Sequence, residues 1–182
     1  MTQSILNSFV ERARVAAASD NATFAIRKLL KSSFSESETM ADAIASLETD
    51  EVMLFEDEFC SIWTCRYNSD VVLAPHEHCM PVYIAVYRGT KVEVLYKREP
   101  TRLRHGGNKV ISAGEVTSLG ADAIHAITAE GFGQSHAIHI YEEPLTAVKR
   151  SLFGWVSGEE VDFTMENFHA MQRQKPDMEE FR

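Results

Sequence analysis

Two histidines separated by one residue are the first candidates for chemistry in this chain. His76 and His78 lie in "APHEHCMPVYIAVYRG", directly after a proline and at the head of a strand-like run. On a strand, residues two apart point to the same side, so both imidazoles can reach one cation. Imidazole is a ligand of iron, zinc, copper and nickel. The alternative is that both residues are solvated at a strand end.

Two further histidines lie in later strand-like runs. His125 lies in "GADAIHAIT", where Ile124 and Ala126 face the opposite side. It interrupts an apolar face, so it is either a metal ligand or a core histidine with a hydrogen-bond partner. His139 lies in "SHAIHIYEE" and shares its face with Tyr141. This pair is either catalytic or a structural hydrogen-bonded pair that closes the fold.

The first 48 residues have the spacing of helices. Three groups of apolar residues are expected to be buried, namely Leu6, Phe9, Val10, Ala13 and Ala17, then Ala22, Ile26, Leu29 and Leu30 in a helix starting at Asp20, then Met40, Ala43, Ile44 and Leu47. Ser35 and Glu38 have the spacing of a capping box for the third helix.

After Thr49 the apolar period changes from helical to two. Short strand-like runs follow, with breaks at Asn68–Ser69, Arg88–Gly89, Gly106–Gly107 and Gly131–Phe132–Gly133. Many short strands separated by turns are typical of a β-sandwich or barrel, and no phosphate-binding glycine motif occurs. We therefore expect a mainly β protein with an N-terminal helical segment at 1–48. A barrel with a C-terminal extension would follow at 49–182, ending in an exposed "KPDMEEFR".

Composition and charge exclude several classes of partner. Hydrophobic residues make up 45% of the chain, charged residues make up 25%, and the formal net charge is -9. The basic residues are scattered, which argues against nucleic acid or anionic lipid. No apolar run is long enough for a membrane span, and the N-terminus lacks the compact apolar region of a signal peptide. Cys60, Cys65 and Cys79 form no disulfide framework, so we expect the reducing cytoplasm.

The order of the histidines resembles the cupin pattern. An H-x-H pair is followed by a strand, a turn glycine at Gly89, further strands and a later single histidine. The resemblance implies a double-stranded β-helix, or jelly-roll barrel, with a metal inside its mouth. The first cupin motif usually continues with a glutamate, and Val82 stands at that position. We therefore predict a metal site of His76, His78 and His125 without a carboxylate ligand.

Three histidines together with "AIHIYEEP" make the chain similar to the cysteine dioxygenase-like (thiol dioxygenase) family, whose members have helices before the barrel. The resemblance covers roughly residues 50–145 by motif order. It implies Fe(II) bound by His76, His78 and His125, while ligand type alone also allows Ni, Zn or Mn. It also implies catalytic roles for Tyr141, which would hydrogen-bond the substrate or oxygen species, and for His139, which would orient Tyr141.

Three positions depart from that family. Ala137 stands where the family has a serine that bonds the histidine, and Ser135, two residues earlier, is the alternative. Cys79 comes too early to match the cysteine that some members cross-link to the tyrosine. The arginine that grips a substrate carboxylate is missing, and the spacing supports neither Arg66 nor Arg88 in its place. Cysteine itself is therefore not the expected substrate.

The predicted function is a mononuclear non-heme Fe(II) dioxygenase that oxidises a small thiol or related small molecule with O2. It would act as a monomer or a homodimer. One alternative is a metal cupin with another small-molecule activity, such as diketone oxidation, isomerisation or hydrolysis. The other is a non-catalytic cupin that binds a small ligand.

The remaining polar and aromatic side chains are expected to be structural. His136 should face away from the site, His105 and His169 should lie on the surface, and Cys79 should be a small buried residue. Trp63 and Tyr87 should pack in the barrel. Tyr83 lies close enough to the histidine pair to stay a candidate for the site.

Overall fold

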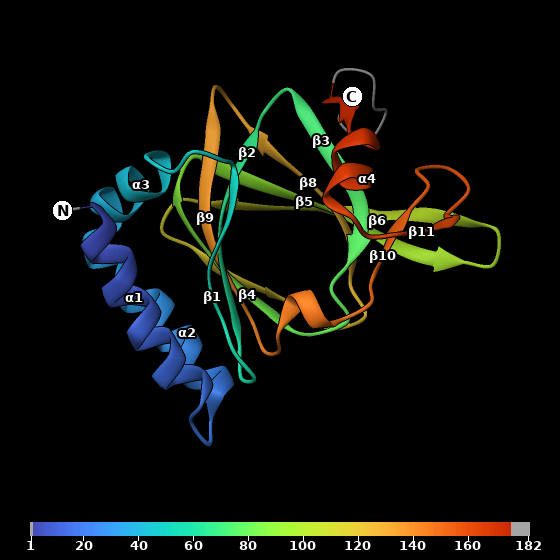
Figure 1. Ribbon diagram of the computed structural model, residues 1–182. Helices are drawn as coiled ribbons and strands as arrows, with labels where there is room; N and C mark the ends of the chain where they lie inside the picture. Colours follow the sequence, from blue (N-terminus) through green and yellow to red (C-terminus); the bar gives the residue numbers. More distant parts are fainter. Residues whose placement is uncertain (1, 176–182) are drawn as a thin grey trace.

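The helical spacing of the first 48 residues produces three α-helices that lie against one side of a β-barrel (Figure 1). The computed structural model describes residues 2–175. The helical elements are α1 (Thr2–Ala17), α2 (Ala22–Ser32), the 3-10 turn η1 (Ser33–Glu36), α3 (Ser37–Ala45), the 3-10 turn η2 (Leu145–Ala147) and α4 (Met165–Ala170). Within the described residues, no helix is long and apolar enough to cross a membrane.

The apolar faces of α1, α2 and α3 cover the outer side of one sheet. Phe9, Ile26 and Ile44 are fully buried there and form one cluster with Tyr83 and Ile138 of the sheet. Burial of such side chains stabilises the contact by about 1.5–3 kcal/mol each. Tyr83 therefore points to the helices and not to the histidine site, where the sequence had left it a candidate.

The expected capping box between Ser35 and Glu38 is not formed. Ser35 lies within η1, and its hydroxyl donates to the carbonyl oxygen of Ser32 at 3.0 Å. The helix α3 starts only at Ser37, without a side-chain cap. The reason is that α2 runs directly into the 3-10 turn, where serine hydroxyls bond carbonyls three residues back. Asn21, one residue after the expected Asp20, caps α2 by accepting from the Phe24 amide.

Two facing antiparallel sheets form the barrel. Their strands are β1 (Glu51–Glu56), β2 (Ser61–Asn68), β3 (Val71–Glu77), β4 (Val82–Arg88), β5 (Thr90–Glu99), β6 (Arg102–Ser112), β7 (Val116–Leu119), β8 (Ile124–Glu130), β9 (Gln134–Tyr141), β10 (Ser151–Phe153), β11 (Glu160–Asp162) and β12 (Arg173–Gln174). One sheet has the order β1-β2-β9-β4-β7, and the other has β11-β10-β3-β8-β5-β6, with β12 beside β3.

The strand order defines the fold class. Strands β2-β9-β4-β7 face β3-β8-β5-β6, so successive strands alternate between the sheets, except at the β5–β6 hairpin, as in an eight-stranded jelly roll. The predicted mainly β, cupin-type double-stranded β-helix with N-terminal helices is therefore confirmed. The C-terminal segment returns over the barrel through β10, β11 and α4 (Figure 1).

The prediction of a turn at Gly106–Gly107 is wrong. Both glycines lie inside β6, and the hairpin between β5 and β6 turns at 100–101. The register shifts between Leu95 and Tyr96 opposite these glycines, and Gly107 has a φ of 120°. The pair thus accommodates a β-bulge, which is the other common role of glycine within a strand. His105 is exposed on this strand and bonds Asn108, so its expected surface position holds.

Gly89 links β4 to β5 where the chain passes from one sheet to the other. Its φ is 70°, and a Cβ there would lie 2.6 Å from the carbonyl oxygen of Gln134. We expect Gly89→Ala to lower the unfolding free energy by roughly 1–3 kcal/mol, because strain in the left-handed region is combined with a backbone clash. Urea unfolding measures the effect.

Gly131→Ala is the matched control for that change. Gly131 has a φ of 81°, but a Cβ there would meet no atom within 4 Å. The difference between the two variants isolates the clash from the φ penalty. Equal losses in the two variants would mean that the close approach to Gln134 contributes nothing.

Candidate metal centre

Strand register brings the three candidate histidines together. His76 on β3 is directly paired with His125 on β8, so both side chains enter the barrel from the same face. His78 follows one residue after the end of β3. One ring nitrogen from each histidine lies within 4.8 Å of the other two, and all three residues are buried. The three histidines predicted from the sequence thus form one cluster, although His125 lies far from His76 and His78 along the chain.

The hydrogen bonds of the rings orient one nitrogen of each histidine toward the other two. His76 Nδ1 lies 2.8 Å from the carbonyl oxygen of Ala74, to which it donates. His125 Nδ1 bonds the carboxylate of Glu93, and its Nε2 lies 2.9 Å from His78 Nε2. Burial lowers the pKa of both His76 and His78 well below the usual value, so these rings are neutral. Imidazole nitrogens that converge on one place fit a divalent transition-metal ion.

Local backbone irregularities place the histidine pair. The β3–β8 register shifts between Leu73 and His76, which puts Pro75 in a bulge where its missing N–H costs no ladder bond. Just after His78, Cys79 has a φ of 58°, an uncommon conformation that turns the chain away from the barrel. Cys79 is consequently exposed. The expectation that it is a small buried residue is wrong, because alternation ends with the strand.

A buried lysine–glutamate pair supports His125, and the sequence analysis missed it. Lys91 and Glu93 lie on β5, are 0% exposed and form an ion pair with each other. Burial opposes the ionisation of Glu93, but His125 and Lys91 outweigh it and hold the pKa of its carboxyl below the usual range. A carboxylate is therefore present behind His125, while Val82 occupies the place of the usual cupin glutamate and packs in the core.

A sequence signal for this pair did exist. Val92 and Val94 are buried on the outer face of the sheet beneath the C-terminal segment, so the alternate residues of β5 must face the barrel interior. The residues at these inner positions, Lys91 and Glu93, are both polar, which indicates a network of hydrogen-bonded polar groups inside the barrel.

His139 and Tyr141 share one hydrogen bond inside the barrel. The Tyr141 hydroxyl and His139 Nδ1 lie 3.1 Å apart. The Tyr141 ring stacks edge-on against His78, with 5.0 Å between ring centroids. Within the described residues, His139 Nε2 and Ser135 Oγ are both buried without hydrogen-bond partners. Ser135 therefore does not take over the bond that a serine at Ala137 would make, and a direct serine–histidine link is not formed.

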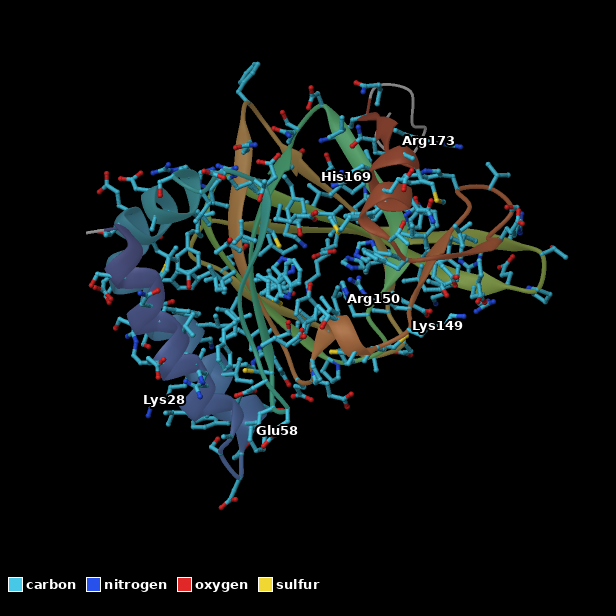
Figure 2. The ribbon with its side chains drawn as sticks, in the orientation of Figure 1. Lys28, Glu58, Lys149, Arg150, His169 and Arg173 are labelled. Atoms are coloured by element: carbon cyan, nitrogen blue, oxygen red, sulfur yellow. The ribbon has the colours of Figure 1, made fainter. Side chains whose placement is uncertain are left out.

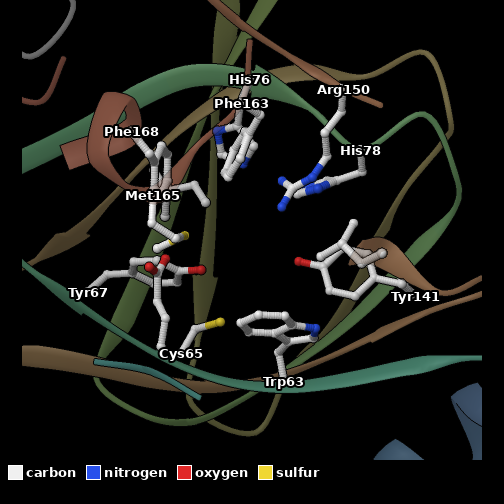
Figure 3. Close-up of a pocket in the computed structure, with 13 residues that line it drawn as sticks. Trp63, Cys65, Tyr67, His76, His78, Tyr141, Arg150, Phe163, Met165 and Phe168 are labelled. Carbon is white, nitrogen blue, oxygen red and sulfur yellow. The ribbon is translucent and has the colours of Figure 1, made fainter. Parts of the chain in front are cut away.

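A cavity opens beside the histidines and is largely aromatic. Figure 3 shows His76 and His78 on one side, Trp63 and Cys65 opposite, and the Tyr141 hydroxyl pointing inward. Trp63 thus lines the cavity, where packing alone had been expected. Its indole is fixed by a 2.7 Å bond from Nε1 to Ser61 Oγ.

The C-terminal segment closes another wall of the cavity. Phe163 and Phe168 both lie edge-on against His76, with ring centroids 5.8 and 5.0 Å away. The aromatic residues of the tail thus pack back onto the barrel. The expected exposed end falls, apart from Lys175, outside the described residues. His136 points out of the barrel and bonds the Ala41 carbonyl oxygen, as expected for a structural residue.

Arg150 is the cation of this cavity. It lies between η2 and β10, its guanidinium stands beside His78 and points inward (Figure 3), and its neighbour Lys149 points to solvent (Figure 2). The guanidinium carbon lies 3.5 Å above the Phe163 ring. Burial lowers the pKa of Arg150, although nearby Tyr141 opposes this. Among the described residues, Arg150 makes no ion pair within 4.0 Å, so it is available to a bound anion. No sequence spacing indicated it, since it lies in an irregular segment.

Comparisons with known proteins found matches among solved structures. No protein-family description and no curated protein matches the chain. Among solved structures, a double-stranded β-helix protein from Klebsiella pneumoniae has 10% identity and a TM-score of 0.47, and covers 62% of this chain and 84% of its own. A cupin-2 domain protein from Shewanella frigidimarina has 16% identity and a TM-score of 0.43, covering 57% and 89%.

A hydroquinone dioxygenase from Sphingomonas has 14% identity and a TM-score of 0.45, covering 56% of this chain and 70% of its own. The structural neighbours include cupins and double-stranded β-helix proteins. At such identities the likeness concerns the fold, so the chemistry has to follow from the side chains of this site.

Proposed function

We propose that the protein is a mononuclear non-heme Fe(II) dioxygenase of the cysteine dioxygenase-like type that oxidises a small thiol with O2. The observation that carries the proposal is the donor set: three histidine ring nitrogens within 4.8 Å of one another, with the carboxylate of Glu93 behind His125. Three neutral ligands leave the full charge of a divalent ion uncompensated. Such a site favours an anionic ligand, and a thiolate is one that forms readily on a metal.

A bound Fe(II) would supply open coordination positions and the redox chemistry that adds both oxygen atoms of O2 to a thiol, giving a sulfinic acid. The residues of this chain bind and orient the reactants. Tyr141 donates a hydrogen bond into the cavity, and burial, with Cys65 adding, raises the pKa of its phenol well above the usual value. The hydroxyl therefore stays protonated and can act as a donor.

His139 and Arg150 complete the proposed machinery. His139 holds the Tyr141 hydroxyl through its Nδ1 and is neutral, because burial lowers its pKa well below the usual value. Arg150 holds an acidic group of the substrate, in place of the family arginine that the sequence lacks. Phe163 and Phe168 keep water from the histidines.

Oxygen uptake with a panel of small thiols tests this proposal. Protein reconstituted anaerobically with Fe(II) is expected to consume one O2 for each sulfinate formed, which balances the reaction RSH + O2 → RSO2H. Protein loaded with redox-inert Zn(II) is the control and should consume none. Arg150→Met should slow the oxidation of thiols that carry a carboxylate more than the oxidation of thiols that lack one. Uptake without sulfinate would count against thiol oxidation.

Two other functions are alternatives. One is a metal cupin that acts on another small molecule, such as a diketone, and the other is a ligand-binding cupin without catalysis. Metal-dependent oxygen uptake with a diketone, but with no thiol, would favour the first of these. Metal binding without any uptake would favour the second. Ni, Zn and Mn remain alternative occupants of the histidine cluster, and metal analysis of the purified protein decides between them and iron.

A further inference from the structure

The cavity has ends of opposite charge. At one end Arg150 stands beside His78, and its positive charge adds to burial in lowering the pKa of that histidine. A divalent ion on the histidines would make this end more positive still. A carboxyl group, Glu51, lines the same cavity. The proposed reaction assigns no role to it.

Strand pairing places Glu51 on the wall away from the histidines. It is the first residue of β1 and pairs directly with Cys65 on β2, so the two side chains share one face of the sheet. Figure 3 shows Cys65 across the cavity from His76 and His78. Glu51 also lines a second cavity, which reaches the surface beside His169 and Gln172. It therefore stands between the metal-binding space and a second opening.

Glu51 is largely buried, and one of its carboxylate oxygens lacks a hydrogen-bond donor within the described residues. Its side chain is 14% exposed, and in the part of the chain that the structure describes its Oε2 has no hydrogen-bond partner. His169 on α4 faces this oxygen, and its Nε2 lies 3.8 Å from Oε2, beyond hydrogen-bond distance. A buried carboxylate oxygen without a donor is costly, so the site is incomplete without a ligand or water that donates to it.

The groups around Glu51 leave a charge for a ligand to match. Burial, with Asp50 adding, raises the pKa of Glu51 to about 7, and Arg150 opposes the rise. Asp50 itself is paired with Arg66 at 2.9 Å, so its charge is already compensated and needs no ligand. The other titratable neighbours are His169 on α4, Cys65 and Tyr67 on β2, and Tyr141 on β9. Burial raises the pKa of Cys65 to about 12 and that of Tyr67 well above its usual value, so both stay neutral.

The geometry points to Glu51 as a recognition site for a protonated amine at the end of the ligand that lies farthest from the metal. An ammonium group supplies the missing donor and the opposite charge together. The ligand class is then a small dipolar molecule, with a metal-binding anionic group at one end and a primary amine at the other. This inference rests on the proposed function, because it takes the histidine cluster as the place where the anionic end binds.

Binding of matched thiols to the Zn(II)-loaded protein under argon tests the inference without turnover. Aminoethanethiol and aminopropanethiol are compared with propanethiol and butanethiol, in which a methyl group replaces the amine, by isothermal titration calorimetry. At about pH 8 the wild type should bind the tighter of the two aminothiols about tenfold or more tightly than the alkyl thiol that matches it. A charge-assisted hydrogen bond contributes that much affinity.

Glu51→Gln should bind each aminothiol and its matching alkyl thiol with about equal affinity. Its affinity for the alkyl thiols should equal that of the wild type, which also shows that the variant folds. Glu58→Gln is the matched control. Glu58 is exposed and lies far from Arg150 and His169 (Figure 2), so the preference should persist. Between about pH 8 and pH 6 the wild-type preference should fall as Glu51 is protonated, whereas in Glu51→Gln it should stay flat.

The outcomes separate the two proposals. If the wild type binds all four thiols but shows no preference for the amines, or if Glu51→Gln keeps the preference, the inference about Glu51 is overturned and the proposed thiol oxidation stands. If the Zn(II)-loaded protein binds none of the four, the proposed function is overturned and the inference falls with it.

Discussion

Replacement of His125 by alanine is expected to abolish stable metal binding. The variant removes one of three ligand nitrogens that lie within 4.8 Å of one another. The metal affinity should fall by more than about 100-fold, because loss of a group that merely supports a ligand already costs roughly 10–100-fold. Metal content after anaerobic reconstitution and chelator competition with Zn(II) and Fe(II) measure the change. Circular dichroism establishes that the variant is folded.

His105→Ala is the control for that variant, because His105 is exposed on β6 and bonds Asn108. It should retain wild-type metal content. Full metal occupancy in His125→Ala would contradict the three-histidine site, and the histidine would then be a core residue satisfied by Glu93. This was the alternative that the sequence left open for His125.

The second large effect is expected at Glu93. Glu93→Gln leaves the ammonium of Lys91 fully buried without its counter-charge; the face of Tyr67, 5.3 Å from Lys91 Nζ to the ring centroid, does not replace it. Breaking a buried ion pair from one side typically costs about 3–5 kcal/mol of unfolding free energy. Urea unfolding of the metal-free variant should show this loss. An unchanged unfolding midpoint would mean that Lys91 is not charged in the folded protein.

The double variant Lys91→Met/Glu93→Leu separates stability from metal support. Because it removes both charges and keeps apolar volume, it should recover most of the stability lost in Glu93→Gln. Its metal affinity should nevertheless stay roughly 10–100-fold below wild type, since His125 Nδ1 has lost its acceptor. Wild-type metal affinity in the double variant would show that Glu93 does not support His125.

Acid titration gives an independent check on Glu93. A glutamate in the unfolded chain has a pKa of about 4.3. The pKa of Glu93 in the folded protein is held below its usual range, as burial is outweighed by His125 and Lys91. Its contribution to stability is therefore fully present above about pH 4.3 and is lost as the pH falls toward the folded value. The wild type should lose stability more steeply with acid than the double variant does.

The histidines could be predicted from sequence because alternation is local. His76 and His78 had to share a face of a strand, and His125 had to interrupt the apolar face of another strand. The change of apolar period after Thr49 likewise separated helices from strands. The jelly-roll fold followed from motif order, and the structure confirms it through the strand order of the two sheets.

Local patterns failed where one short pattern serves two structures. Gly106 and Gly107 are compatible with a turn and with a bulge, and pairing with β5 selects the bulge. Ser35 has capping-box spacing, but the continuation of α2 into η1 uses its hydroxyl elsewhere. In both cases the backbone hydrogen bonds of neighbouring elements decided the outcome.

The sequence by itself determined the histidine cluster, the Tyr141 and His139 pair and the class of fold, because these depend on strand periodicity and on motif order. Only the tertiary structure brought Glu51 and Arg150 into the same cavity as the histidines and put Lys91 and Glu93 behind His125. The physical reason is that the cavity is closed by β1, by the segment before β10 and by the tail. Their positions are set by long-range pairing and packing, which no spacing along the chain records.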